Sequence, residues 1–192
     1  MSGESGNFFV FEGLDGVGKS TVAEAFADEI DGIYMESPGP GIQEIREYVD
    51  SEPHSKQTQF LMYMASNSAL GDQIEERINQ GEDVVLDRYY PTTVVYNEAD
   101  EDESGRWREL AREFDFLEPD HMFYLWTNTE TRLERKSGRT SKDEGRDADQ
   151  IGYSGVEQAY ERAVEDYDMT KIEAVEGVQN VVDRTLEEAG LK

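Results

Sequence analysis

The chain has 192 residues, of which 44 are Asp or Glu and 18 are Lys or Arg, so its formal net charge is −26. A surface this acidic repels nucleic acid polymers and anionic membranes, and no apolar run is long enough to span a bilayer. The sequence contains no cysteine, which excludes disulfide bonds, a thiol nucleophile and a cysteine-ligated metal.

The length fits a single α/β domain that covers residues 1–192, and no repeat or shift in composition indicates a second domain. The N-terminus lacks the cationic start and apolar core of a signal peptide, so we expect a cytoplasmic protein. The acidic residues are dispersed and lysine is scarce. This composition resembles that of proteins from salt-loving microbes, in which salt screens the self-repulsion.

Strands and helices are predicted to alternate along the chain. Apolar, β-prone runs predict strands at 7–11, 32–35, 84–87, 121–126 and 171–175. Apolar residues at helical spacing predict helices at 21–30, 42–49, 56–80, 105–114, 129–136, 154–166 and 178–188. In the helix at 105–114, we expect Arg106, Arg108 and Arg112 to lie on a solvated face. The alternation predicts a three-layer α/β/α fold with a five-stranded parallel sheet that binds ligands at the carboxyl ends of its strands.

A phosphate-binding loop follows the first predicted strand. Residues 13–20 read Gly-Leu-Asp-Gly-Val-Gly-Lys-Ser, a complete G-x-x-x-x-G-K-[ST] pattern. Glycines let several backbone N–H groups converge on phosphate oxygens, and the next helix adds the positive end of its dipole. Lys19 is expected to reach the β- and γ-phosphates, and Ser20 to bind Mg²⁺. The predicted nucleotide-binding residues are Gly13, Asp15, Gly16, Val17, Gly18, Lys19, Ser20 and Thr21.

The third predicted strand ends in Asp87, and Arg88 follows it directly. In a protein with a phosphate-binding loop, a carboxylate at this place can orient Mg²⁺ or its water ligands. Arg88 can hold a second phosphate through two parallel hydrogen bonds. The alternative is a solvated strand end with a surface ion pair.

A basic segment interrupts the acidic chain. Five of the 18 cations lie between Arg135 and Arg146, among glycines and polar residues, which predicts a mobile basic loop at about 136–150. Such a loop can close over a γ-phosphate, exclude water and neutralise developing charge. Because the variable positions of the phosphate-binding loop contain no arginine, Arg139 and then Arg135 are the candidates for this role. The alternative is a solvated loop without a function.

With these residues in view, the chain resembles the thymidylate kinase family of P-loop nucleoside monophosphate kinases. The stretch 11–21 is similar to the family's strand and phosphate-binding loop, with its acidic residue inside the loop. Asp87-Arg88-Tyr89 resembles the DR[YH] motif, residues 92–97 resemble an S-x-x-A-Y-Q stretch, and residues 45–47 resemble an Ile-Arg-Glu run. The order and spacing of the motifs hold from about residue 7 to residue 190.

The resemblance implies a P-loop kinase fold, a homodimer, and transfer of the ATP γ-phosphate to dTMP to give dTDP, with Mg²⁺ as the second cofactor. It implies that Asp15 accepts a hydrogen bond from the acceptor 3′-hydroxyl, that Arg88 and Arg46 hold the acceptor phosphate, and that Tyr96 fills the space of a 2′-hydroxyl. Thr92 and Asn97 belong to the same acceptor stretch. The catalytic residues are then Lys19, Arg139, Arg135, Arg88 and Asp87, which position the phosphates and neutralise charge without a general base.

The sequence departs from the family where the acceptor base is read. The family's F-x-A-x-R pattern corresponds to residues 63–67, in which Tyr63 can stack on a pyrimidine but Asn67 replaces the arginine. An asparagine side chain both donates and accepts hydrogen bonds, so it can suit thymine or a different acceptor base. The alternative for Tyr63 is that it is a core residue of its helix. Asn97 stands for the family's glutamine, and no arginine precedes Pro38.

The alternative functions are a P-loop kinase for another nucleotide or for a deoxynucleoside, and a GTPase-like switch. The switch is disfavoured because residues 127–130 lack the lysine of an N-K-x-D motif.

Overall fold

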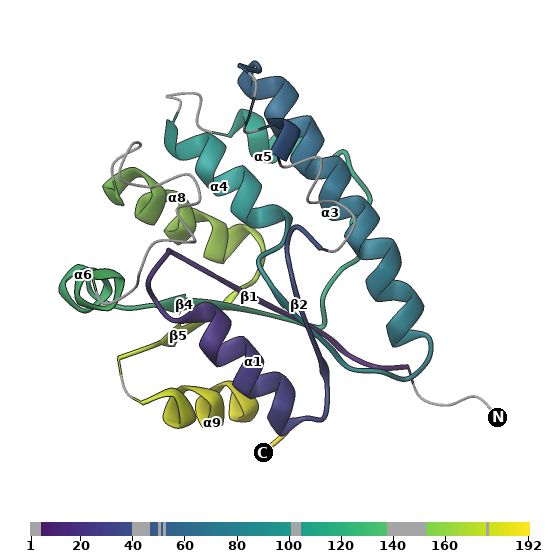
Figure 1. Cartoon of the computed structure of the whole chain (residues 1–192), viewed down its shortest axis with the longest axis vertical. Coiled ribbons are helices and arrows are strands. Elements are labelled where there is room, and N and C mark those ends of the chain that lie inside the picture. Colours follow the sequence, from purple (N-terminus) through teal and green to yellow (C-terminus); the bar gives the residue numbers. More distant parts are fainter. Residues whose placement is uncertain are drawn as a thin grey trace.

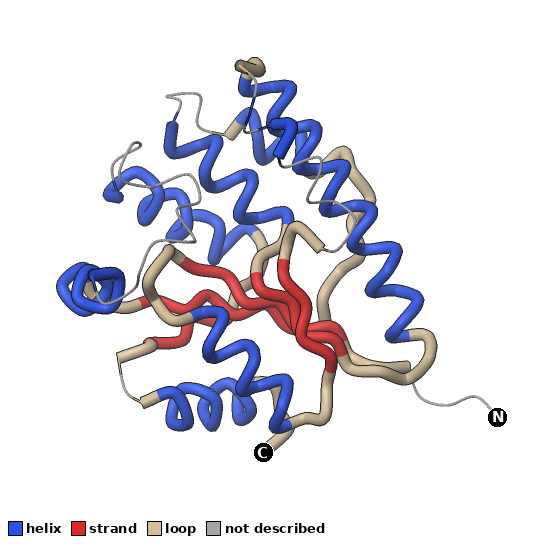
Figure 2. Tube along the Cα trace, in the orientation of Figure 1, coloured by secondary structure: helices blue, strands red, loops and turns tan. Residues whose placement is uncertain are grey.

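The computed structural model describes residues 5–39, 47–49, 51, 53–100, 105–137, 153–175 and 177–192. Its centre is a β-sheet (Figure 2). The sheet has five strands in the order β2-β3-β1-β4-β5, and all neighbouring strands are parallel. The strands are β1 Phe8–Gly13, β2 Ile33–Glu36, β3 Val84–Asp87, β4 His121–Trp126 and β5 Thr170–Glu173. The predicted five-stranded parallel sheet is confirmed.

Helices cover both faces of the sheet (Figure 1). They are α1 Lys19–Glu29, α3 Lys56–Ile78, α4 Tyr90–Asp100, α5 Arg106–Ala111, α6 Thr129–Ser137, α8 Tyr153–Asp166 and α9 Val178–Glu188. Helices α1 and α9 pack together on one face, and α4 and α8 pack together on the other, with α3 and α5 against α4. This arrangement is the predicted α/β/α architecture. Within the described ranges, no helix combines the length and the apolar character needed to cross a membrane.

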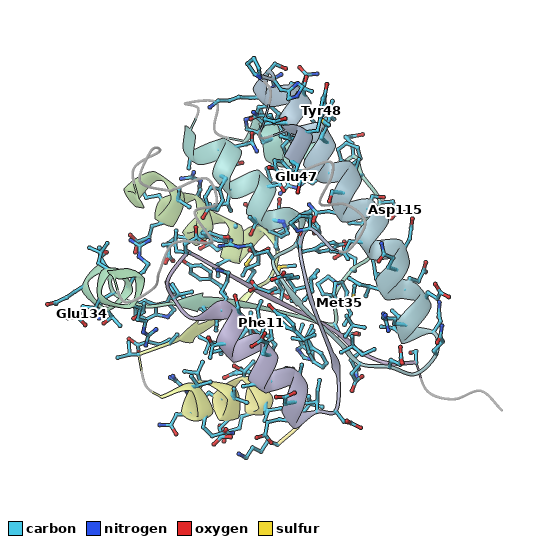
Figure 3. The ribbon with its side chains drawn as sticks, in the orientation of Figure 1. Phe11, Met35, Glu47, Tyr48, Asp115 and Glu134 are labelled. Carbon is cyan, nitrogen blue, oxygen red and sulfur yellow. The ribbon has the colours of Figure 1, made fainter. Side chains whose placement is uncertain are left out.

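The central strand β1 is buried at every residue. On the face covered by α1, the rings of Phe9 and Phe11 lie 5.1 and 5.3 Å from the ring of Phe26. Phe11 lies between the sheet and α1 (Figure 3), and its ring centre is 5.2 Å from that of Phe123 on β4. Because aromatic side chains bury a large area, this packing holds β1, and the loop that follows it, firmly in the core.

Helix α4 was not predicted. Its first residues include Pro91, Thr92, Thr93, Val94 and Val95, and β-branched residues have a low helix propensity. Tertiary packing outweighs this preference, since Val94 and Val95 are only 1% exposed. Pro91 is tolerated because the N–H groups in the first turn of a helix have no acceptor within the helix, so no hydrogen bond is lost when proline lacks its N–H.

Several predicted boundaries also differ, and the strand predicted at 7–11 extends to Gly13. The strand predicted at 171–175 ends at Glu173, and the helix predicted at 105–114 is the shorter α5. Of the helix predicted at 42–49, residues 47–49 are described and helical. Arg46, Arg139 and most of the loop predicted at about 136–150 lie outside the described residues; Lys136 and Ser137 end α6.

The expectation that Arg108 lies on a solvated face is wrong. Its side chain is 13% exposed and donates to Glu98 on α4 at 2.6 Å and to Asp166 on α8. The carboxylate of Glu98 is fully buried, so it requires a cationic partner from a neighbouring element. Arg112, in contrast, is exposed as expected.

Candidate active site

The phosphate-binding loop joins β1 to α1 at the carboxyl edge of the sheet. Gly13 has a φ of 145°, and a Cβ there would lie 2.4 Å from the carbonyl oxygen of Leu125, so only glycine fits. Lys19 is 6% exposed, and its Nζ donates to the carbonyl oxygen of Leu14 at 3.3 Å. Burial, followed by the nearby charge of Arg88, lowers the pKa of Lys19 to about 8. The loop therefore holds its lysine over its own curled backbone.

A hydroxyl and a carboxylate meet beside this loop. Ser20 Oγ donates to Asp87 Oδ2 at 2.6 Å. Asp87 is 6% exposed, and its other oxygen, Oδ1, is buried without a hydrogen-bond partner among the described residues. Oxygen ligands of this kind fit a divalent cation such as Mg²⁺, which usually takes its remaining ligands from water and substrate phosphates. In the part of the chain that the structure describes, no three His, Cys, Asp or Glu side chains group around a metal position.

Arg88 directly follows β3 at the same edge of the sheet. It has a φ of 70°, a left-handed conformation that is rare for a residue with a side chain and that clusters at functional sites. Its backbone N–H donates to Phe11 O at 3.0 Å, and its Nη2 donates to Asp15 Oδ1. Its Cζ lies 6.0 Å from the centre of the Tyr96 ring. The structure thus brings together Asp15, Arg88 and Tyr96, which the family resemblance assigns to one acceptor site.

Behind Arg88 lies a buried cluster that sequence reasoning missed. Glu12 is fully buried at the end of β1; it accepts from Tyr89 N at 2.9 Å, from Thr92 Oγ1 at 2.5 Å and from the Tyr160 hydroxyl at 3.0 Å. Burial raises the pKa of Glu12, while these donors and Arg88 act in the opposite direction. The available signal was one carboxylate in an otherwise apolar strand, whereas nothing in the sequence singled out Tyr160.

The residues predicted to face the acceptor base come from α3. Tyr63 is half-buried there, and Asn67 is 2% exposed. Asn67 accepts from Ser37 Oγ at 3.2 Å and donates to Thr93 Oγ1 at 3.4 Å, so it joins the end of β2 to α4. Asn97 donates to the carbonyl oxygen of Thr93 at 2.7 Å, within its own helix. The amides of both asparagines are therefore engaged by the protein itself.

Arg135 reaches the phosphate-binding loop from α6. Its Nη1 donates to the carbonyl oxygen of Val17 at 2.9 Å. Beside this contact lies a cavity of about 360 Å³, lined by Gly16, Val17, Gly18, Thr21, Val22, Arg135, Ala174, Gly177, Val178 and Val181. The predicted candidate Arg135 thus lies at the phosphate-binding loop.

The chain is similar to known thymidylate kinases. A family model described as "Thymidylate kinase" matches residues 11–185. The thymidylate kinase of Ruegeria pomeroyi is 33% identical over 75% of this chain and 74% of its own length. The probable thymidylate kinase of Methanococcus aeolicus is 31% identical over 71% and 69%, and the thymidylate kinase of Leptospira borgpetersenii is 28% identical over 94% and 91%.

A solved structure agrees with these sequence matches. The thymidylate kinase of Candida albicans aligns with a TM-score of 0.78 at 22% identity, over 97% of this chain and 92% of that one, which shows a shared fold. The family match extends over both the phosphate-binding loop and the Asp87–Tyr89 stretch. The chain therefore belongs to the thymidylate kinase family, whose members are ATP-dependent phosphotransferases.

Proposed function

We propose that this protein transfers the γ-phosphate of ATP to the 5′-phosphate of dTMP, giving ADP and dTDP. The observation that carries the proposal is that two sets of side chains suited to bind phosphates lie together at the carboxyl ends of β1 and β3. Lys19 and Ser20 form the donor side, and Arg88, held by Asp15, forms the acceptor side. A nucleotide switch needs only the first of these, whereas a kinase for a phosphorylated acceptor needs both.

On the donor side, the phosphates of ATP lie over the loop formed by residues 13–20. The cavity beside Val17 and Arg135 continues to the start of α9 and offers space for the nucleoside of ATP. Ser20 and Asp87 hold Mg²⁺, which supplies positive charge to the phosphates when it is bound. The buried Oδ1 of Asp87, for which the described residues offer no hydrogen-bond partner, supports this assignment.

On the acceptor side, Arg88 holds the 5′-phosphate, together with Arg46. Asp15 accepts a hydrogen bond from the 3′-hydroxyl. Tyr96, whose ring lies next to Arg88, packs where a 2′-hydroxyl would otherwise fit. Tyr63 stacks on the base. Asn67 and Asn97, whose amides are held by the protein, shape the base pocket together with the hydroxyl of Thr93.

The reaction needs no general base, because the acceptor phosphate is ionised near neutral pH. Catalysis consists of holding the acceptor oxygen in line with the γ-phosphate and of neutralising charge as the phosphoryl group moves. Lys19, Arg88 and Arg135 supply positive charge, and Arg139 adds to it.

A coupled assay of ADP release at high salt, run across nucleoside monophosphates and nucleosides, tests this function. We expect turnover with dTMP. Turnover only with another monophosphate or with a nucleoside shows that the acceptor is not dTMP, but it still supports a kinase. ATP or GTP hydrolysis that no acceptor stimulates contradicts the kinase and favours a nucleotide switch. Light scattering of the same sample tests the homodimer that the family resemblance implies.

A further inference from the structure

The cluster behind Arg88 joins three elements that are distant in the sequence. Tyr160 on α8 and Glu12 on β1 are both fully buried, and Thr92 comes from α4. The Tyr160 hydroxyl lies 3.0 Å from Glu12 Oε2 and 3.0 Å from Thr92 Oγ1. Arg88 Nη1 donates to both hydroxyls, at 3.2 Å to Thr92 and 3.4 Å to Tyr160.

The protons of this cluster can be assigned by counting. Each hydroxyl has one proton, and an ionised carboxylate only accepts. Three donors, including the backbone N–H of Tyr89, converge on Glu12, and the cationic Arg88 lies nearby. Because Glu12 takes the protons of Thr92 and Tyr160, the lone pairs of both hydroxyls point to Arg88 Nη1. Asp15 holds Nη2, so both arms of the guanidinium are fixed.

We propose that Tyr160 is a positioning residue for Arg88: through its hydroxyl, held by Glu12, it directs the Arg88 guanidinium toward the acceptor phosphate. The inference rests on the proposed function, which assigns that phosphate to Arg88. Tyr160 itself touches no reacting atom. Its position on α8, 72 residues beyond Arg88, makes the orientation of Arg88 depend on how α8 packs against β1 and α4.

The variant Tyr160→Phe removes the hydroxyl and keeps the ring, which stacks on that of Tyr124 at 5.1 Å. The matched control is Tyr167→Phe, directly after the same helix, because the buried Tyr167 hydroxyl has no hydrogen-bond partner among the described residues. At saturating ATP, we expect Tyr160→Phe to raise the KM for dTMP about tenfold, as for the loss of one hydrogen bond to a charged group. The KM for ATP stays unchanged, and Tyr167→Phe behaves like the parent protein.

A double-mutant cycle separates positioning from a general loss of structure. If Tyr160 acts through Arg88, adding Tyr160→Phe to Arg88→Lys raises the KM for dTMP little further. Fully additive effects, or an equal rise in the KM for ATP, overturn the proposal.

A measurement without substrate distinguishes this proposal from the proposed function. The ¹⁵N signals of the Arg88 guanidinium, assigned through Arg88→Lys, are expected to shift and to show faster rotation in Tyr160→Phe but not in Tyr167→Phe. Unchanged signals overturn the positioning role even if dTMP is phosphorylated. Changed signals in a protein that does not phosphorylate dTMP support it while the proposed function fails. If Tyr160→Phe does not fold, Glu12→Gln, whose amide offers a donor to the hydroxyls, must change the same signals.

Discussion

Ser20 Oγ and Asp87 Oδ2 lie 2.6 Å apart although 67 residues separate them in the sequence. The contact forms because β1 and β3 are parallel neighbours, so that α1, which follows β1, begins beside the end of β3. Of the Asp87 carboxylate, Oδ1 has no hydrogen-bond partner among the described residues. Hydroxyl and carboxylate therefore present oxygen atoms to the same point above the phosphate-binding loop.

Replacing Asp87 with Asn tests this point as a magnesium site. The substitution removes the negative charge and keeps the size, so we expect the Mg²⁺ concentration for half-maximal activity to rise by about ten- to a hundredfold. A titration of activity with Mg²⁺ measures the effect. Asp28→Asn, on the exposed side of α1, removes the same charge at a distance and serves as control. Equal Mg²⁺ dependence in the two variants would remove Asp87 from the metal site.

The lowered pKa of Lys19 predicts that ATP binding weakens at high pH. The pKa of this lysine in the free protein is lowered to about 8, and only the protonated amine attracts phosphate. Above that pH, kcat/KM for ATP is expected to fall by about tenfold per pH unit, while below it Lys19 imposes no change. Because bound phosphates favour the charged lysine, kcat should fall only at a higher pH.

The variant Lys19→Arg provides the control for this profile. Arginine stays charged over the whole range, so its lower activity should not decline above pH 8. A decline at the same pH in both proteins would assign the limit to another group.

Replacing the two candidate arginines, Arg139 and Arg135, should change different kinetic constants. Arg139→Ala should lower kcat by at least about a hundredfold and leave the KM for dTMP nearly unchanged, because its contact is made in the transition state. Arg135 contacts the phosphate-binding loop through the carbonyl oxygen of Val17, so Arg135→Ala should also raise the KM for ATP. Arg112→Ala, an exposed cation on α5's end, is the control. If kcat of Arg139→Ala equals that of the control, Arg139 is not catalytic.

The ion pair between Glu98 and Arg108 predicts a large effect on stability. Arg108→Ala leaves the buried Glu98 carboxylate without its main partner, so the free energy of unfolding should fall by about 3–5 kcal/mol. In Arg77→Ala, the lost pair with Glu82 is more than 40% exposed on both sides, and the fall should not exceed about 1 kcal/mol. Urea unfolding at fixed high salt measures both. Similar values for the two variants would show that the buried pair contributes no more than a surface pair.

Much of the fold could be predicted because its signals are local. Apolar runs located β3 and β4 at their observed bounds, and helical spacing located α9. Where a local preference conflicts with packing, prediction failed: the β-branched start of α4 concealed a helix that is buried between α3 and α8. Arg108 looked like a surface residue for the same reason, since its partners Glu98 and Asp166 come from other helices.

By itself, the sequence determined the phosphate-binding loop, the alternation of strands and helices, and the catalytic candidates Lys19, Asp87 and Arg88, because each follows from spacing within a short segment. The tertiary structure decided which of these residues meet. Register places Phe11 beside Asp87, so β1 runs past the end of β3 and brings Glu12 to the N–H of Tyr89. The contact of Tyr160 with Arg88 depends on α8 packing across that strand end. Such contacts have no signature in the sequence, because they are set by the relative positions of separately folded segments.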